Sequence, residues 1–138
     1  MREEGTLSDA LRALAHELVE KLDADAAVIS RVLGDVLIIV TQTTTDASLL
    51  SLGQGFLVSD YPPTRQVVDT REPRVLTLAD DDVDPAEAEV LRALGFSTLL
   101  MLPFDLHGMR WGLVEIYRAE LRPFTDAEIA AAIALARL

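Results

Sequence analysis

Leucines recur at helical spacing along the first 22 residues, and the positions between them are mainly polar or small. Their spacing of three or four residues predicts a helix over residues 6–22 with one apolar face. Thr6 precedes Asp9 by three residues and resembles a capping box in which Asp replaces Glu. The apolar stripe consists of Leu7, Leu11, Leu14, Leu18 and Leu22.

Two pairs of β-rich runs are each separated by a short turn. The first pair spans residues 26–33 and 36–45, and the Gly-Asp pair between them is typical of a tight turn. The second pair spans residues 97–104 and 110–118 and is joined around a His-Gly pair. Together they predict hairpins over residues 26–45 and 97–118.

A central connection over residues 53–96 carries the signals of shorter elements. Residues 65–70, which follow two adjacent prolines, predict a short helix, and residues 74–78 predict a short strand. Asp84 as N-cap, proline at the first helical position and Glu87 at the third predict a further helix start. This helix is expected to end at Gly95.

The last helix is predicted over residues 125–138. Thr125 and Glu128 form a capping box, and Phe124 and Ile129 form a hydrophobic staple around it. No C-cap signal precedes Leu138. We therefore expect this helix to continue into a connecting helix of a longer protein.

The order of these elements predicts an α+β fold. A central antiparallel sheet of five to six strands would carry the terminal helices on one face and the central connection on the other. A chain of 138 residues is long enough for one core, so a single domain over residues 1–138 is expected.

Composition narrows the range of partners. The net charge of −11 repels phosphate backbones, so no nucleic-acid partner is expected. No apolar run has the length of a membrane span and the first residues do not resemble a signal peptide, so we expect a cytoplasmic protein without a membrane partner. The sequence has no cysteine, which excludes disulfides, thiolate metal sites and cysteine nucleophiles.

Several short motifs, taken together and in order, resemble those of GAF domains over nearly the whole chain. They are Gly55-Phe-Leu57, Asp60-Tyr-Pro-Pro-Thr-Arg65, Leu91-Arg-Ala-Leu-Gly-Phe-Ser97, Trp111-Gly-Leu-Val-Glu115 and Arg122-Pro-Phe-Thr-Asp126. The resemblance implies a GAF-like fold related to PAS domains. It also implies a bacterial sensory or regulatory module that controls an output domain, such as a cyclic-di-GMP enzyme, a histidine kinase or a phosphatase.

The stretch Ser59-Asp-Tyr-Pro62 also resembles the Ser-Asp-Ile-Pro of phytochromes, in which the Asp approaches the pyrroles of a bilin. Bilins are usually held by a cysteine thioether, and this chain has no cysteine. His16 and His107 are far apart in the sequence and do not form the ligand set of a haem or zinc site. We therefore expect no cofactor, covalent bilin and haem included, and no metal.

Alternation along the last predicted strand places the odd-numbered side chains from Trp111 to Tyr117 on one face, and Val114 and Ile116 on the other. A carboxylate among aromatic side chains is typical of the floor of a small-molecule site. The candidate ligand-binding residues are Phe56, Asp60, Tyr61, Arg65, Trp111, Glu115 and Tyr117. Alternatively, the stretch around the prolines only caps and positions a helix, with Arg65 facing back toward Asp60.

No serine is placed with a histidine and an acid in a pattern typical of nucleophilic catalysis, so no catalytic residue is assigned. The sequence favours a non-enzymatic sensor of a small, non-covalent ligand, which meets Asp60 or Glu115 through a positive or hydrogen-bonding group. Two alternatives stay open. One is a ligand-free dimerisation domain, and the other is an enzyme on a GAF scaffold that uses carboxylates such as Asp60 and Glu115.

The terminal helices carry apolar stripes that predict a homodimer. Part of this surface must cover the aliphatic face of the sheet, but the remainder is available to a second copy of the chain. The candidate dimer residues are Leu7, Leu11, Leu14, Leu18, Ile129 and Ile133. Alternatively, both stripes are used inside one chain.

Overall fold

The computed structural model describes residues 6–44 and 54–137, so the predicted endpoints at 45, 53 and 138 lie outside the described residues. The elements are α1 (Leu7–Leu22), β1 (Ala26–Leu33), β2 (Val36–Thr44), β3 (Gly55–Leu57), the 3₁₀ helix η1 (Val58–Asp60), α2 (Pro62–Thr70), β4 (Arg74–Thr77), α3 (Pro85–Leu94), β5 (Thr98–Leu106), β6 (Met109–Arg118) and α4 (Asp126–Leu135). Within the described ranges, no helix is both long enough and apolar enough to cross a membrane.

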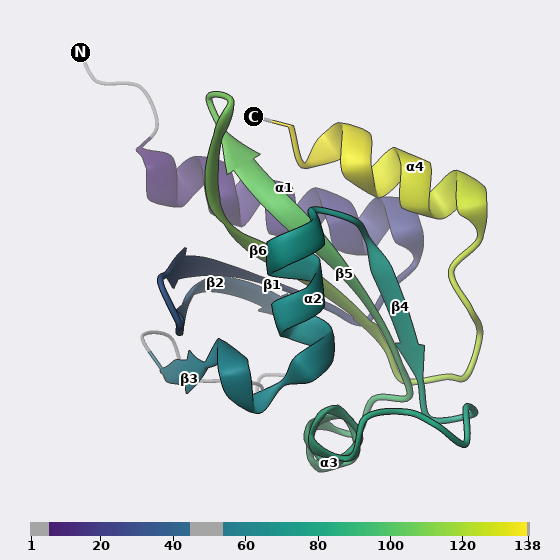
Figure 1. The fold of residues 1–138 in the computed structure, drawn as a ribbon. Helices are drawn as coiled ribbons and strands as arrows, with labels where there is room; N and C mark the ends of the chain where they lie inside the picture. Colours follow the sequence, from purple (N-terminus) through teal and green to yellow (C-terminus); the bar gives the residue numbers. More distant parts are fainter. Residues whose placement is uncertain (1–5, 45–53, 138) are drawn as a thin grey trace.

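The strands form one antiparallel sheet of six strands in the order β3-β2-β1-β6-β5-β4 (Figure 1). The two predicted hairpins pair β1 with β2 and β5 with β6. Gly34, His107 and Gly108 have positive φ values of 62°, 52° and 77°, which tight hairpin turns require. These strands and helices confirm the predicted α+β fold.

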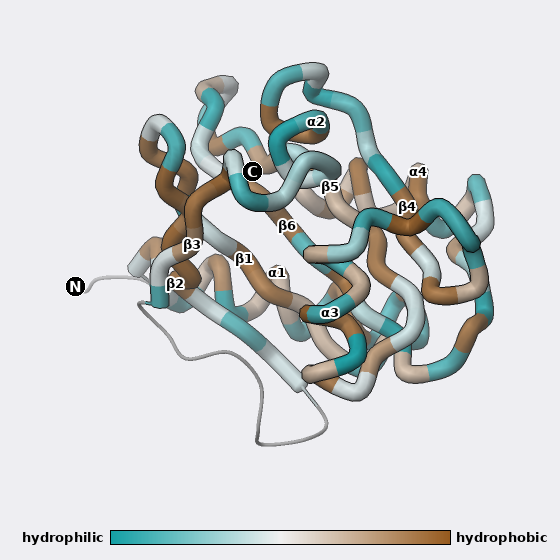
Figure 2. The backbone as a smooth tube through the Cα atoms, turned by 60° about the horizontal axis from the view of Figure 1, so that its bottom comes forward, coloured by the Kyte–Doolittle hydropathy of each residue, from teal (hydrophilic) through white to brown (hydrophobic). Residues whose placement is uncertain are grey.

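Two hydrophobic clusters lie on opposite faces of the sheet. One packs α1 and α4 against side chains such as Ile29, Val114 and Ile116. The other lies under η1, α2 and α3 and includes Val28, Leu113 and Tyr117. In Figure 1, α2 passes in front of the sheet, whereas α1 lies behind it. Figure 2 shows hydrophobic positions along the central strands β1 and β6 and many hydrophilic ones along α2. The central connection thus forms its own layer, which is where a pocket can open.

The leucine stripe of α1 is used inside the chain. Leu11, Leu14 and Leu18 are buried in the first cluster, with Leu18 fully enclosed, whereas Leu7 is 45% exposed. Ile129 and Ile133 of α4 are partly buried against the same cluster. The assignment of Leu11, Leu14 and Leu18 to a dimer interface is therefore corrected, because these side chains are already buried against the sheet of their own chain.

Two predicted helix limits differ from the structure, and one strand was not predicted. Helix α2 begins at Pro62 rather than at residue 65, because a helix tolerates proline in its first turn, where the N–H has no partner. The three-residue strand β3 was not predicted, since its run is too short to show alternation. Helix α4 ends at Leu135, and Arg137 forms a bridge with Asp105, so the prediction of continued helix beyond residue 135 is wrong.

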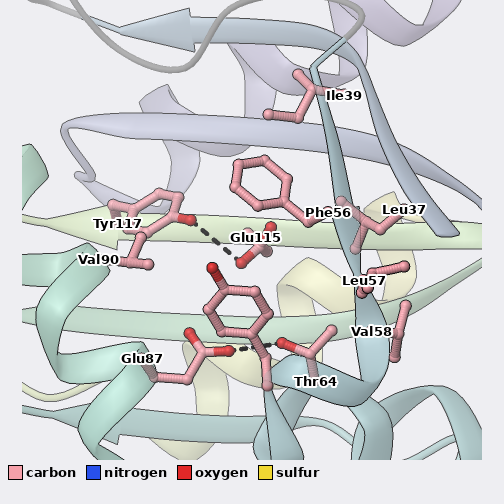
Figure 3. A pocket seen from close by; sticks show the side chains of 11 residues that line it. Leu37, Ile39, Phe56, Leu57, Val58, Thr64, Glu87, Val90, Glu115 and Tyr117 are labelled. Carbon is pink, nitrogen blue, oxygen red and sulfur yellow. Dashed lines mark hydrogen bonds between the residues drawn. The ribbon is translucent and has the colours of Figure 1, made fainter. Parts of the chain in front are cut away.

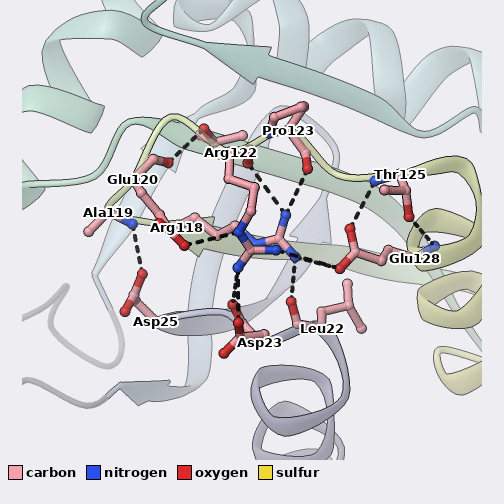
Figure 4. Close-up of polar contacts among 11 residues, drawn as sticks. Leu22, Asp23, Asp25, Arg118, Ala119, Glu120, Arg122, Pro123, Thr125 and Glu128 are labelled. Carbon is pink, nitrogen blue, oxygen red and sulfur yellow. Dashed lines mark hydrogen bonds and ion pairs between the residues drawn. The ribbon is translucent and has the colours of Figure 1, made fainter.

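A buried arginine at the end of β6 connects the two terminal helices (Figure 4). The Arg118 guanidinium donates to the carbonyls of Leu22 and Pro123 and to Glu128 Oε2, the last at 2.7 Å. It lies 4.0 Å from the centroid of the Phe124 ring. From one position on the sheet, this side chain thereby provides a hydrogen-bond donor to the last carbonyl of α1 and to a side chain in the first turn of α4.

Candidate functional site

A pocket lies between the sheet and the central connection, with a cavity volume of about 40 Å³ (Figure 3). Its floor comes from β2 and β6, and its walls come from β3, η1, α2 and α3. Six of its lining residues are aliphatic or phenylalanine, and the other five carry hydroxyl or carboxyl groups. The described lining residues are Leu37, Ile39, Phe56, Leu57, Val58, Tyr61, Thr64, Glu87, Val90, Glu115 and Tyr117.

Strand β6 supplies the polar floor of the pocket. Glu115 and Tyr117 lie two residues apart and therefore point to the same face of the sheet. The Tyr117 hydroxyl donates to Glu115 Oε2 at 3.1 Å, and the Tyr117 ring stacks on Phe96 with centroids 5.1 Å apart. Glu115 is only 9% exposed. A carboxyl group is thus held in a fixed orientation within an apolar layer.

Helix α3 brings a second carboxyl group to the same pocket. Asp84 caps the helix by accepting from the N–H of Glu87 at 3.1 Å, which fixes the first turn. The Glu87 side chain turns inward, is 4% exposed, and accepts a 2.6 Å hydrogen bond from the Thr64 hydroxyl on α2. Figure 3 shows Glu87 and Glu115 on opposite sides of the pocket. The cap and the hydroxyl together position an acid where an apolar residue is usual.

Burial changes the protonation of both acids. Loss of solvation and, to a smaller extent, the neighbouring Glu87 together raise the pKa of Glu115 to about 8, against the opposing effect of the hydrogen bond from Tyr117. Burial also raises the pKa of Glu87, and the hydrogen bond from Thr64 partly offsets this. Burial raises the pKa of Tyr117 well above its ordinary value. Glu115 is therefore mainly a neutral carboxylic acid at pH 7 when the pocket holds no cation.

This protonation predicts that the folded chain loses stability as the pH rises. Between the ordinary Glu pKa of 4.5 and the folded value of about 8, the native state holds a proton that the unfolded state releases. Through Glu115 alone, the free energy of unfolding should then fall by up to about 1.4 kcal/mol per pH unit between about pH 5.5 and pH 8, and any contribution from Glu87 would be common to the variants compared below. Urea denaturation at these pH values measures the slope.

Glu115→Gln supplies the comparison, because glutamine keeps the shape of the side chain without titrating. Its stability should fall less over the same range, whereas Glu17→Gln on the exposed face of α1 should follow the wild type. Groups with lowered pKa values, such as Glu128, titrate at more acidic pH and affect all three proteins alike. Equal slopes for the wild type and Glu115→Gln would show that Glu115 is ionised in the folded chain.

Four of the seven candidate ligand-binding residues line this pocket, namely Phe56, Tyr61, Glu115 and Tyr117. The Phe56 and Tyr61 rings meet edge to face, with centroids 6.1 Å apart. Asp60, Arg65 and Trp111 are not among the described lining residues. Asp60 is exposed at the end of η1, so the structure does not bring it together with Glu115.

Trp111 lies on the opposite face of the sheet from Glu115. Its ring meets Phe104 edge to face at 5.7 Å and packs against the cluster under α1 and α4. The reason is a β-bulge, in which Trp111 and Gly112 stand opposite the single residue Phe104. Simple alternation placed Trp111 with Glu115, but one extra residue reverses the face of every side chain beyond it. The predicted shared face is therefore wrong for Trp111.

Arg65 pairs with Asp35 and Asp69 rather than with Asp60. Its guanidinium donates to Asp35 in the β1–β2 turn and lies 3.4 Å from Asp69 one helical turn on. Asp35 also accepts from the backbone and the hydroxyl of Ser59, the latter at 2.6 Å. In the alternative interpretation of this stretch, Arg65 would face back toward Asp60; the structure instead shows this network, which connects the β1–β2 turn to η1 and α2.

Glu87 and Thr64 also line the pocket, although neither was among the candidate ligand-binding residues. A signal for Glu87 was present, because it shares a helix face with Leu91 and Leu94 at spacings of four and seven residues. A carboxylate on the apolar face of a helix indicates a buried acid. Thr64 carried no such signal, since its role depends on the packing of α2 against α3. Within the described ranges, no group of three or more His, Asp or Glu side chains could hold a metal ion.

The fold and its pocket define a class of α+β domains with a site between the sheet and a central connection. Residues 6–138 match the family model of the GAF domain. The chain therefore belongs to the GAF domain family, and the resemblance stated from its motifs is confirmed. A comparison with curated proteins gave no match.

Several solved structures share this fold. A phycocyanobilin-bound GAF domain from a cyanobacterial phytochrome has a TM-score of 0.77 and 22% identity, covering 95% of this chain and 80% of that one. A GAF domain/HD domain protein from Geobacter sulfurreducens has a TM-score of 0.77 and 19% identity, with coverage of 94% and 86%. The GAF domain of a two-component sensor histidine kinase from Bacillus halodurans has a TM-score of 0.75 and 17% identity, with coverage of 95% and 88%.

The first of these structures corrects the expectation that this chain has no cofactor. That expectation depended on the missing cysteine, yet a domain with the same fold over 95% of the chain holds a linear tetrapyrrole. The absence of cysteine excludes a thioether bond only. It does not exclude a tetrapyrrole held by hydrogen bonds and packing. The absence of one residue type was therefore not sufficient to predict that the chain has no cofactor.

Proposed function

We propose that this GAF domain is a sensory module that binds a small molecule in the pocket between its sheet and α2–α3, and that binding controls an output domain. The observation that carries the proposal is the pocket itself, in which two fixed carboxyl groups and three hydroxyl groups face an otherwise apolar cavity. A few convergent polar groups in an apolar cavity are typical of ligand sites. The proposed action is binding without turnover.

A GAF domain/HD domain protein and a sensor histidine kinase are among the proteins with this fold, and they support an output domain of the signalling kind. Binding at the floor of the pocket acts on β6, which runs directly from Tyr117 to Arg118. Arg118 contacts both terminal helices, so a shift of β6 reaches the chain ends through buried hydrogen bonds. This path offers a physical link from ligand to output.

A thermal-shift screen of metabolites tests the proposal. A ligand present at about 100 times its Kd should raise the Tm of the wild type by about 10 °C, because it binds only the folded state. Glu17→Gln should respond like the wild type, whereas Glu115→Gln should lose most of the shift. No shift with any compound, or equal shifts for all three proteins, would refute a sensor site at this pocket.

A linear tetrapyrrole is a second candidate occupant, favoured by the phycocyanobilin-bound GAF domain of the same fold. Here Glu87 and Glu115 would accept hydrogen bonds from pyrrole N–H groups, without a covalent bond to the chain. Incubation with phycocyanobilin followed by gel filtration tests this occupant. Visible absorbance that elutes with the wild type but not with Glu115→Gln would support it, and complete separation of pigment from protein would refute it.

A further inference from the structure

We infer that the pocket selects a small organic cation, an alkylammonium with a short apolar body, over neutral and anionic molecules of the same shape. This inference depends on the proposed function, since it names the ligand class of the same site. It follows from three features of the pocket: the charges that line it, the oxygen atoms left free in it, and its size.

The charged groups that line the pocket are all acidic. Of the described lining residues, Glu87 and Glu115 are ionisable acids, and none is Arg, Lys or His. Arg74 acts on Glu87 from outside the lining, and Asp84 opposes that effect. A carboxylate or phosphate ligand would meet two acids without a compensating cation, at a place where burial weakens solvent screening. A cation at the same place would instead be attracted by both acids.

In each of the two carboxyl groups, one oxygen atom accepts a hydrogen bond from a neighbouring hydroxyl group. Tyr117 donates to Oε2 of Glu115, and Thr64 donates to Oε1 of Glu87, so both carboxyl groups are held in orientation. Within the described part of the chain, no hydrogen bond reaches Glu115 Oε1 or Glu87 Oε2. An ammonium group carries three N–H donors and no acceptor, which matches two free carboxylate oxygens and a nearby hydroxyl.

The remaining surface favours a short apolar body. A cavity of about 40 Å³ has room for an ammonium head group, and the pocket is partly open to solvent, so an alkyl chain can extend outward. Leu37, Ile39 and Val90 offer aliphatic contacts beside the acids, and the Phe56 and Tyr61 rings offer faces or edges to a cation.

Binding of a cation should release a proton. Glu115 is mainly neutral in the empty pocket, where Glu87 on α3, Tyr61 before α2 and Tyr117 on β6 are the titratable groups that face it. An ammonium group has a pKa near that of lysine, about 10.4, and stays charged, so its arrival favours the ionised form of Glu115. The affinity should rise with pH up to about 8 and then level off.

Isothermal titration calorimetry with three matched probes tests the inference. Isobutylamine, isobutanol and isobutyrate share a branched apolar body and differ in charge. At pH 7.5 we expect isobutylamine to bind at least about tenfold more tightly than isobutanol, a difference of about 1.4 kcal/mol, and isobutyrate not to bind. Between pH 6 and pH 7 the affinity for isobutylamine should rise by up to about tenfold.

Variants separate this site from non-specific attraction to an acidic protein. Glu115→Gln should lower the affinity for isobutylamine at least about tenfold and flatten its pH dependence, while Glu17→Gln should change neither. Glu87→Gln gives a second test from another element, should Glu115→Gln fold poorly. Equal losses with Glu17→Gln would overturn the assignment to the pocket.

The outcomes distinguish this inference from the proposed function. If isobutanol or isobutyrate binds as tightly as isobutylamine, the selection of a cation is refuted while a ligand site remains. The inference also fails if no probe binds while an uncharged or anionic metabolite raises the Tm of the wild type but not of Glu115→Gln. If no compound of any class stabilises the chain, the proposed function and the inference fail together.

Discussion

Gly112→Ala should destabilise the fold by about 3 kcal/mol or more, among the larger effects of a single methyl group. A Cβ atom at this position would lie 1.8 Å from the backbone oxygen of Ser30 and 2.9 Å from its carbonyl carbon. Ser30 lies in the middle of β1, whose pairing with β6 forms the centre of the sheet. Because the obstructing atoms are backbone, relief requires the two central strands to separate.

Gly55→Ala is the matched control for this prediction. A Cβ atom there would lie 3.8 Å from the backbone oxygen of Leu37, an ordinary contact, and Gly55 is also in a strand. Its free energy of unfolding should stay within about 0.5 kcal/mol of the wild type. Urea denaturation of the three proteins measures the difference. A Gly112→Ala protein as stable as Gly55→Ala would show that β1 and β6 are not in the close register described above.

Local signals predicted much of this fold because helix starts depend on a few neighbouring residues. The capping boxes at Thr6 and Thr125 and the cap at Asp84 all form as their sequences indicate. Gly95 ends α3 with a φ of 79°, the conformation that a helix end favours for glycine. Each of these features depends on residues within about one helical turn of one another, so it can be predicted from the sequence alone.

Long-range features could not be predicted in the same way. The bulge that moves Trp111 to the far face depends on how β5 and β6 pair; the isolated Gly112 in the strand is a signal of a bulge or a close approach, but it does not show which side chain changes face. The Asp35 partner of Arg65 is 30 residues away in sequence. Glu87 and Glu115 come from different elements, so their approach follows from the packing of α3 on the sheet. A candidate site thus needs the fold before its members can be grouped.

The leucine stripe of α1 illustrates a different kind of ambiguity. Its spacing indicates an apolar face but does not say what covers it. The structure shows that the sheet covers most of it, since Leu11, Leu14 and Leu18 contact the cluster that contains Val114 and Ile116. The same pattern would serve a dimer interface equally well. Leu7, at the start of the stripe, is the member that stays 45% exposed.

Arg118→Met should cost about 3–5 kcal/mol of stability, the largest effect we expect from a change near the terminal helices. Its guanidinium is fully buried and donates to the carbonyls of Leu22 and Pro123 and to the Glu128 carboxylate. Methionine fills similar volume but donates no hydrogen bond, so these three acceptors would lose a buried partner. The junction of β6 with α1 and α4 would loosen.

Arg122→Met is the matched control, because Arg122 lies next to the same junction but its side chain is 38% exposed. It pairs with Asp23 and Glu120 at 3.0 Å each, and such exposed pairs contribute less than about 1 kcal/mol. Urea denaturation should therefore separate the two variants by at least about 2 kcal/mol. If they are equally stable, the buried hydrogen bonds of Arg118 do not hold the terminal helices. The route proposed from the pocket through β6 to the chain ends would then lose its physical basis.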